Sequence, residues 1–160
     1  MNEQTLTVRI RAMHPDDYEA VFEVARALAN WFTAPDQLMI AADLARYEGV
    51  VAEIDERVVG FAIYHPIMPD IMALAWIGVA PSHQQHGIGS QLLDAVERIA
   101  HARGYQTLEV RTIAPEVPAP HFEATRRFYL RRGFKVWRRE EHVFGIQRHA
   151  LVLVKQLTSK

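Results

Sequence analysis

The fold is decided by one stretch of the chain, IGVAPSHQQHGIGSQLL at residues 77–93. An apolar run ends at Pro81, a polar turn follows, and Gly87 and Gly89 open a segment with helical periodicity. The first N–H groups of a helix have no partners inside it, and together with the helix dipole they bind phosphate oxygens. Because glycine has no Cβ, it lets the backbone approach such a ligand. We therefore predict that an anion binds at this turn.

Other interpretations of the same glycines can be compared with this one. An isolated Gly-x-Gly often only forms a tight turn, but here the strand before and the amphipathic helix after supply the context of a binding loop. No Gly-Lys-Ser or Gly-Lys-Thr follows, which argues against a P-loop and hence against an NTPase-like domain. The third glycine of a dinucleotide fingerprint would fall at Leu92, so a dinucleotide enzyme is disfavoured as well.

Outward from this stretch, apolar periodicity predicts the remaining elements. Strands are expected at residues 6–12, 50–54, 58–64, 71–79, 108–111, 134–143 and 150–157, and helices at residues 21–32, 33–47, 88–104 and 121–132. We expect Gly49 to close the second helix and residues 55–57 to form a three-residue hairpin connection. The strand at residues 71–79 is apolar almost throughout, which predicts a central place in the sheet.

The order of these elements predicts one mixed α/β or α+β domain, residues 1–160, with helices packed on a single sheet. A chain of 160 residues has the length of one ordinary domain. Pro115, Pro118 and Pro120 make residues 113–120 an irregular connection that cannot join a sheet interior.

Composition excludes several classes of protein. The formal charge of −1 gives no general attraction for nucleic acid or an anionic membrane, so we predict neither as a partner. The absence of cysteine removes disulfides, a thiolate nucleophile and cysteine-based zinc sites, and it fits a reducing compartment. The polar N-terminus resembles no signal peptide and no apolar run reaches membrane-spanning length. The chain is therefore predicted to be cytoplasmic.

Two further blocks of sequence carry specific motifs. The first is Val79-x-Pro81-x-x-Gln84-x-x-Gly87-x-Gly89-x-x-Leu92-Leu93, and the second is Phe128-Tyr129-Leu130-Arg131-Arg132-Gly133-Phe134. The first looks like the acyl-CoA-binding motif of the GNAT (GCN5-related) N-acetyltransferase family, and the second resembles the Phe-Tyr-x-x-x-Gly-Phe segment of that family. The resemblance implies an acyl-CoA N-acyltransferase fold, a central mixed β-sheet with helices on both faces.

The resemblance also implies acetyl-CoA as co-substrate. The pyrophosphate would rest on the amides of residues 85–90, residues 77–79 would pair with the pantetheine arm, and the amide of Val79 or a neighbour would polarise the thioester carbonyl. The implied cofactor-binding residues are Ile77, Gly78, Val79, Gln84, Gln85, His86, Gly87, Ile88, Gly89, Ser90 and Arg126. Where the family usually has Arg-Gly-Lys or similar, this chain has Gln84-Gln85-His86, which weakens the fixed positive charge near the phosphates.

Tyr129 and Glu109 are the predicted catalytic residues. By resemblance, Tyr129 protonates the departing CoA thiolate, although from the bare sequence it could equally be a core aromatic residue. Glu109 points opposite to Leu108 and Val110 on its strand and could be the general base, or it could be a solvated strand charge. Weaker candidates for the base are His121, Glu141 and His142.

One basic cluster and eight histidines remain. The cluster is expected to form a solvated helix face, except that Arg126 could reach the CoA phosphates; its members are Arg126, Arg127, Arg131, Arg132, Lys135, Arg138 and Arg139. The histidines show no spacing such as His-Glu-x-x-His, so no metal is predicted.

These observations predict an N-acetyltransferase that moves an acetyl group from acetyl-CoA directly to an amine of an unidentified acceptor, either a small molecule or a peptide N-terminus. Without cysteine there is no thiol to carry an acyl intermediate, which favours direct transfer. The alternative is a noncatalytic acyl-CoA-binding sensor or regulatory module. The acceptor pocket is expected beside residues 113–120 and the first two helices, where Trp31, Phe32 and Tyr64 are either lining or core. A homodimer is compatible with the sequence.

Overall fold

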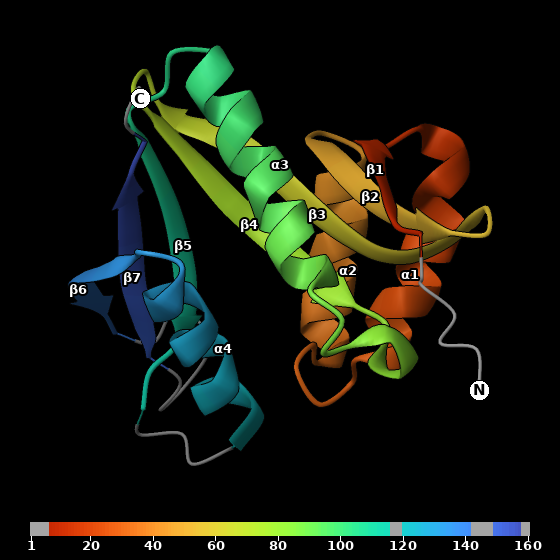
Figure 1. The fold of residues 1–160 in the computed structure, drawn as a ribbon. Coiled ribbons are helices and arrows are strands. Elements are labelled where there is room, and N and C mark those ends of the chain that lie inside the picture. The colour runs from red at the N-terminus through yellow and green to blue at the C-terminus, as the bar shows by residue number, and fades with distance from the viewer. Residues whose placement is uncertain (1–6, 116–119, 142–148, 158–160) are drawn as a thin grey trace, which may run out of the picture. The chain divides into compact units, whose positions relative to one another are not determined.

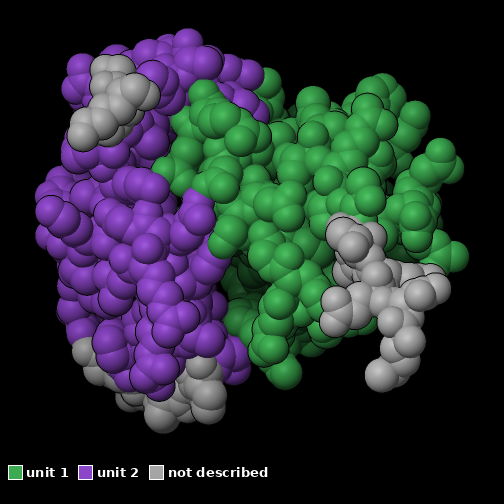
Figure 2. All heavy atoms as spheres, in the orientation of Figure 1, with its two compact units in different colours: residues 1–65, 76–98 green, residues 66–75, 99–160 purple. Residues whose placement is uncertain are grey.

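The structure, a computed structural model, describes residues 7–115, 120–141 and 149–157. The chain divides into two compact units (Figure 2). Unit 1 comprises residues 1–65 and 76–98, and unit 2 comprises residues 66–75 and 99–160. The described strands form one mixed sheet in the order β1-β2-β3-β4-β5-β7-β6 (Figure 1). β4 is the fourth of the seven, which confirms its predicted central place.

The described elements follow the predicted order closely. The strands are β1 (Arg9–Ala12), β2 (Glu48–Ile54), β3 (Arg57–Met68), β4 (Ile71–Val79), β5 (Thr107–Ile113), β6 (Lys135–Glu140) and β7 (Ala150–Gln156). The helices are α1 (Tyr18–Ala27), α2 (Ala34–Leu44), α3 (Ile88–Ala102) and α4 (Pro120–Arg131), with short 3-10 turns at η1 (Pro15–Asp17) and η2 (Pro81–His83). Leu6 and Val143, at the ends of two predicted strands, lie outside the described residues.

Two local predictions were wrong. Gly49 does not close α2; it lies inside β2 opposite Ile63, where a Cβ would come within 2.6 Å of the Ala62 carbonyl oxygen and 2.7 Å of the Met13 side chain. Glycine is needed there for close approach, which depends on residues distant in sequence. The β2–β3 connection has two residues because Ile54 pairs with Arg57, and both Asp55 (φ 50°) and Glu56 (φ 64°) have the left-handed conformation that two-residue hairpin turns require.

Unit 1 has helices on both faces of its strands. Gly60 and Phe61 are successive residues of β3 and therefore point to opposite faces. A Cβ at Gly60 would lie 3.1 Å from Leu92 of α3. On the Phe61 face, a Cβ at Gly78 would meet Leu28, just after α1, at 2.8 Å. The predicted placement of helices on both faces is thus confirmed within this unit.

Unit 2 is built on parallel and antiparallel neighbours of β5. The first half of β4 runs parallel to β5, with Leu74 opposite Val110, and β7 runs antiparallel to β5 and to β6. The connection from β5 to β6 contains α4, which is followed by Gly133 at a φ of 94°. The buried residues of this unit include Leu108, Val110, Tyr129, Phe134 and Leu153.

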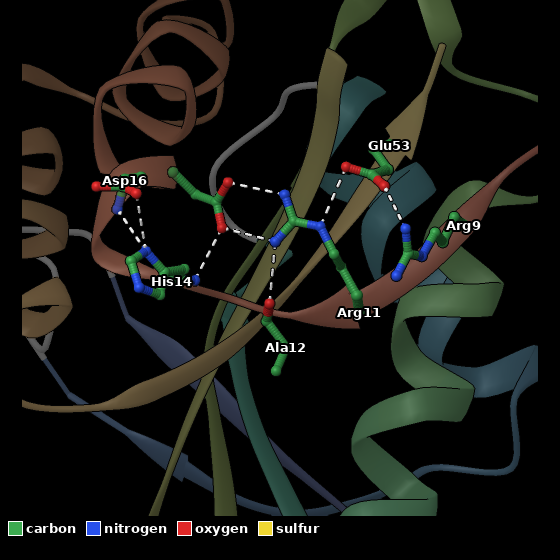
Figure 3. A network of polar contacts seen from close by, with 7 residues as sticks. Arg9, Arg11, Ala12, His14, Asp16 and Glu53 are labelled. Carbon is green, nitrogen blue, oxygen red and sulfur yellow. Dashed lines mark hydrogen bonds and ion pairs between the residues drawn. The ribbon is translucent and has the colours of Figure 1, made fainter. Parts of the chain in front are cut away.

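A polar network ties β1, η1 and β2 together within unit 1 (Figure 3). The Arg11 guanidinium donates from Nη1 and Nη2 to the two carboxylate oxygens of Asp17, each at 2.8 Å, and from Nε to Glu53 at 3.1 Å. The buried Asp17 carboxylate also accepts the backbone N–H of His14 at 2.8 Å. The Arg11 guanidinium holds the pKa of Asp17 below its usual range, against the opposing effect of burial.

Asp17→Asn should lower the free energy of unfolding by about 1–3 kcal/mol at neutral pH, because it removes a buried bidentate partner of Arg11. Asp16→Asn is the matched control, since that neighbouring side chain is 93% exposed. Urea unfolding of both variants measures the difference. Equal midpoints for the two variants would contradict a stabilising role for the Arg11–Asp17 pair.

The same pair predicts the direction of acid sensitivity. Because the folded pKa of Asp17 is below the unfolded value of about 3.9, its stabilising contribution is complete above that pH and is lost as pH falls through the folded pKa. Wild type should therefore lose more stability than Asp17→Asn below about pH 4, and their unfolding free energies should converge.

Candidate functional site

The turn between β4 and α3 exposes the backbone that the sequence marked as an anion site. η2 follows β4, and Gln85, His86 and Gly87 are exposed to solvent before α3 starts at the buried Ile88. Gln85 and Gly87 have φ values of 67° and 77°. The family pattern has glycine at the position of Gln85, and the left-handed conformation explains this, because residues with a Cβ rarely adopt it.

The backbone donors of this turn are unpaired. Across the described part of the chain, no group accepts a hydrogen bond from the N–H groups of residues 85–90, whereas the next amide, that of Gln91, donates to the Gly87 carbonyl at 3.1 Å. A Cβ added at Gly87 would meet nothing within 4 Å, so the space in front of this glycine is open. Consecutive free amides at the positive end of a helix are the arrangement that binds phosphate groups.

The side chain of Gln84 fixes the turn to the strand. Its Nε2 donates to the carbonyl of Val79 at 3.0 Å, and the amide of Ala80 donates to Val59 at 2.8 Å. Both contacts hold the end of β4 in place. The side-chain nitrogen of Gln84 is therefore occupied by the Val79 carbonyl. Gln84 would contribute to an anion site by positioning the backbone.

The α1 and α2 side of β4 carries an aromatic pair that the sequence did not single out as a unit. Trp76 donates its Nε1–H to Asp43 of α2 at 2.8 Å and meets the ring of Phe32 edge-on, with centroids 5.7 Å apart. Trp31, Phe32 and Trp76 are partly exposed, whereas Tyr64 is buried in the core. A tryptophan within an apolar strand was the available signal for Trp76. Nothing in the sequence pointed to Asp43.

Tyr129 lies in the interior of unit 2. Its side chain is 2% exposed and packs edge-on against Phe128 and Phe134, with centroids 5.3 Å away in both cases. Burial raises the pKa of the Tyr129 phenol, so the group stays protonated at neutral pH. The ring of Tyr129 is therefore part of the core, and its hydroxyl retains the proton that the catalytic interpretation requires. Burial is thus compatible with both interpretations of this residue.

Glu109 is buried as well, which excludes the alternative that it is a solvated strand charge. Its side chain is 2% exposed because β5 is an inner strand, and its partners in register are Ala73 on β4 and Val154 on β7. Glu109 Oε1 lies 3.2 Å from Arg111 Nη1, but no hydrogen bond of good geometry reaches this oxygen from any described residue. A buried carboxylate in ionic contact with an arginine is a candidate for proton transfer.

The remaining predicted residues have varied surroundings. Arg126 Nη1 donates to the carbonyl of Ile113 at 2.8 Å, which ties α4 to the end of β5. Glu141 pairs with Arg139 at 2.8 Å and with His149 at 2.9 Å, and His142 lies outside the described residues. Among the described contacts of the basic cluster, Arg127 pairs with Glu123 at 2.6 Å, Arg138 with Glu140 at 3.1 Å and Arg139 with Glu141 at 2.8 Å.

The described residues contain neither a metal-binding cluster nor a membrane-spanning helix. Within residues 7–115, 120–141 and 149–157, no three His, Asp or Glu side chains gather where they could hold a metal ion. In the same residues, no helix has the length and apolar character needed to cross a membrane.

The mixed seven-stranded sheet and the four helices of the described chain match the fold of GNAT acyltransferases. The acetyltransferase (GNAT) family matches residues 9–134. The chain belongs to this family and is an acetyl-CoA-dependent N-acetyltransferase. The resemblance inferred from the two sequence blocks is thereby confirmed.

Solved structures share the fold over nearly the whole chain. A protein from Desulfovibrio desulfuricans assigned to the GNAT family is 24% identical with a TM-score of 0.80, covering 95% of this chain and 100% of that one. The ribosomal-protein-S18-alanine N-acetyltransferase from Escherichia coli is 19% identical with a TM-score of 0.76, covering 96% of each chain. A GNAT family acetyltransferase from Elizabethkingia anophelis with acetyl-CoA bound is 19% identical with a TM-score of 0.74, covering 94% of this chain and 98% of that one. A comparison with curated proteins gave no match.

Proposed function

We propose that the free amides of residues 85–90 hold the pyrophosphate of acetyl-CoA, and that the acetyl group passes directly to an acceptor amine. One observation carries this proposal: six consecutive backbone positions at an exposed helix start have no hydrogen-bond acceptor among the described residues. Buried or structural backbone groups are almost always paired, so a row of exposed free donors fits a ligand site.

The cofactor is expected to follow the strand that leads into this turn. In the proposed arrangement residues 77–79 pair with the pantetheine arm, and the Val79 amide or one beside it donates to the thioester oxygen. A donor fixed at the end of a strand needs no reorganisation when negative charge develops on that oxygen. The contact from Gln84 to the Val79 carbonyl supports this role, because it makes the end of β4 rigid.

The reaction joins the amine nitrogen to the acetyl carbon and breaks the bond from that carbon to sulfur. The amine must lose a proton to attack, and Glu109 is the proposed acceptor of that proton. The sulfur departs as the CoA thiolate and takes its proton from solvent, while Glu109 releases the proton of the amine to solvent, so that the number of protons is conserved. With no cysteine in the chain, no thiol can carry the acetyl group between the two substrates.

Tyr129 is proposed to stabilise the leaving sulfur through its hydroxyl. The raised pKa of Tyr129 keeps the proton on the phenol, but it lies above the value of about 8.5 typical of a thiol. Full transfer from this phenol to a thiolate is therefore uphill. A hydrogen bond from Tyr129 that strengthens as charge forms on sulfur fits the burial better than complete proton release.

The acceptor is proposed to be a small-molecule amine or a peptide N-terminus. The solved structures that share the fold include both kinds of enzyme, an aminoglycoside 6'-N-acetyltransferase and the S18-alanine N-acetyltransferase. Their identities of 16% and 19% support the fold alone and do not choose between these classes. A cytoplasmic location and a homodimer stay predictions from the sequence.

Release of CoA thiol across a panel of amines tests the activity. The panel should contain polyamines, aminoglycosides, amino acids and short peptides, with acetyl-CoA affinity measured by calorimetry in parallel. Thiol release that depends on one amine supports the transferase. Tight binding of acetyl-CoA without release in any mixture would favour the sensor, and absence of binding would contradict the proposed cofactor site.

Gly87→Ala should weaken acetyl-CoA binding at least about tenfold, because the new methyl group enters the space in front of the free amides. Gly104→Ala is the matched control: its φ is 87°, a Cβ there also meets nothing within 4 Å, and it follows the other end of α3. Each variant should lose about 1 kcal/mol of stability from the left-handed conformation. Equal acetyl-CoA affinity in the two variants would contradict the site.

Tyr129→Phe should lower kcat by about 100-fold while the affinity for acetyl-CoA stays unchanged, because the hydroxyl acts when charge forms on sulfur. Tyr105→Phe removes a hydroxyl from a partly exposed tyrosine in the turn after α3 and serves as the control. Steady-state kinetics and calorimetry on the same preparations separate turnover from binding. Equal kcat in both variants and wild type would remove Tyr129 from the mechanism.

A further inference from the structure

Arg111 of β5 lies between two carboxylates in unit 2. Its Nη1 is 3.2 Å from Oε1 of Glu109 on the same strand, and its Nε donates to Oε1 of Glu140 on β6 at 2.6 Å. The side chain of Glu109 is in the interior and 2% exposed, whereas the side chains of Arg111 and Glu140 are partly exposed, at 35% and 25%.

The two contacts of Arg111 are unequal. The contact with Glu140 is a short hydrogen bond of good geometry, whereas Oε1 of Glu109 has only the ionic contact and no hydrogen bond from any described residue. Hydrogen bonding to Glu140 is the largest cause that raises the pKa of Arg111, and the same contact lowers the pKa of Glu140. Glu140 is thus the principal partner of the Arg111 guanidinium, and Glu109 makes the weaker of the two contacts.

We propose that Glu140 is a positioning residue of the acetyl-transfer reaction, because it holds Arg111 and offsets its positive charge so that Glu109 can accept the proton of the amine. The inference rests on the proposed role of Glu109 as general base. A fully expressed positive charge beside a carboxylate stabilises the ionised form and makes it a poorer proton acceptor. Glu140 offsets part of the positive charge of Arg111 through its hydrogen bond to Nε.

β6 carries two further charged groups that contact these residues or share a row with them. Arg138 Nη2 contacts Oε2 of Glu140 at 3.1 Å, so the second oxygen of Glu140 is also engaged. Lys135 lies in the same row as Glu109, separated from it by Val154 of β7. The direct register neighbours of Glu109, Ala73 and Val154, carry no charge. Within these described contacts, Arg111 is the cation that contacts Glu109, and Glu140 is the second carboxylate that contacts Arg111.

The geometry requires an arginine at position 111. One guanidinium can serve two carboxylates from different nitrogens because its donors are fixed in a plane, whereas a lysine ammonium offers a single charged point. Glu140 also accepts at Nε, the nitrogen closest to the backbone, which leaves the terminal nitrogen directed to Glu109. Glu140 therefore orients the guanidinium as well as offsetting its charge.

The test is the pH dependence of kcat at saturating acetyl-CoA, with the same active amine for every variant. In Glu140→Gln the acidic limb should move to lower pH by about half a unit or more, because Glu109 then faces the whole charge of Arg111. The maximal rate should fall, since a weaker base transfers a proton less readily. Glu123→Gln is the matched control, because it removes the same charge from a 54% exposed residue of α4 that pairs with Arg127.

Arg111→Gln gives an independent check with the opposite sign, because loss of the guanidinium should move the acidic limb to higher pH. An unchanged limb in Glu140→Gln, or an equal shift in Glu123→Gln, would overturn the role of Glu140 while the acetyltransferase activity stands. A Glu109→Gln enzyme with the wild-type rate and limb would also overturn it, by removing the base. Failure of the wild type to release CoA with any amine would instead contradict the proposed function itself.

Discussion

The site depends on one constraint: a helix that starts directly after a buried strand leaves its first amides without partners. In this chain the constraint is enforced from both sides of the turn. Ile88 is buried and anchors the helix start, while the contacts from Gln84 to Val79 and from Ala80 to Val59 hold the strand end. The amides between these anchors have neither internal acceptors nor freedom to find them, so they stay available to a ligand.

Most of the fold could be predicted because its signals are local. Period-two and helical patterns placed the strands and helices in order, and a uniformly apolar segment marked β4 as central. The prediction that Gly49 closes α2 failed for a physical reason. A Cβ at this position would collide with Ala62 and Met13, which lie elsewhere in the chain. The hairpin loop was one residue shorter than predicted because the register of Ile54 with Arg57 is fixed by pairing and not by composition.

The candidate site likewise has one part that local sequence predicts and one part that depends on distant residues. The turn between β4 and α3 could be predicted because its backbone geometry depends on consecutive residues, the two glycines and the polar residues before them. The side-chain partners were not, since Trp76 meets Asp43 across 33 positions and Arg111 meets Glu140 across 29. The burial of Glu109 belongs to this second class, because it follows from the strands on either side of β5. Sequence alone left this glutamate open between a solvated charge and a base.

These two kinds of site element differ in how much substitution they tolerate. Backbone donors persist whatever side chains surround them, which explains how Gln84, Gln85 and His86 can stand where the family usually carries Arg-Gly-Lys. The cost falls on Gln85, which takes a left-handed conformation that glycine would adopt freely. A buried carboxylate has no such independence, because its ability to take a proton depends on each charge near it. The proton-transfer step should therefore depend on Arg111 and Glu140 more strictly than cofactor binding depends on any side chain of the turn.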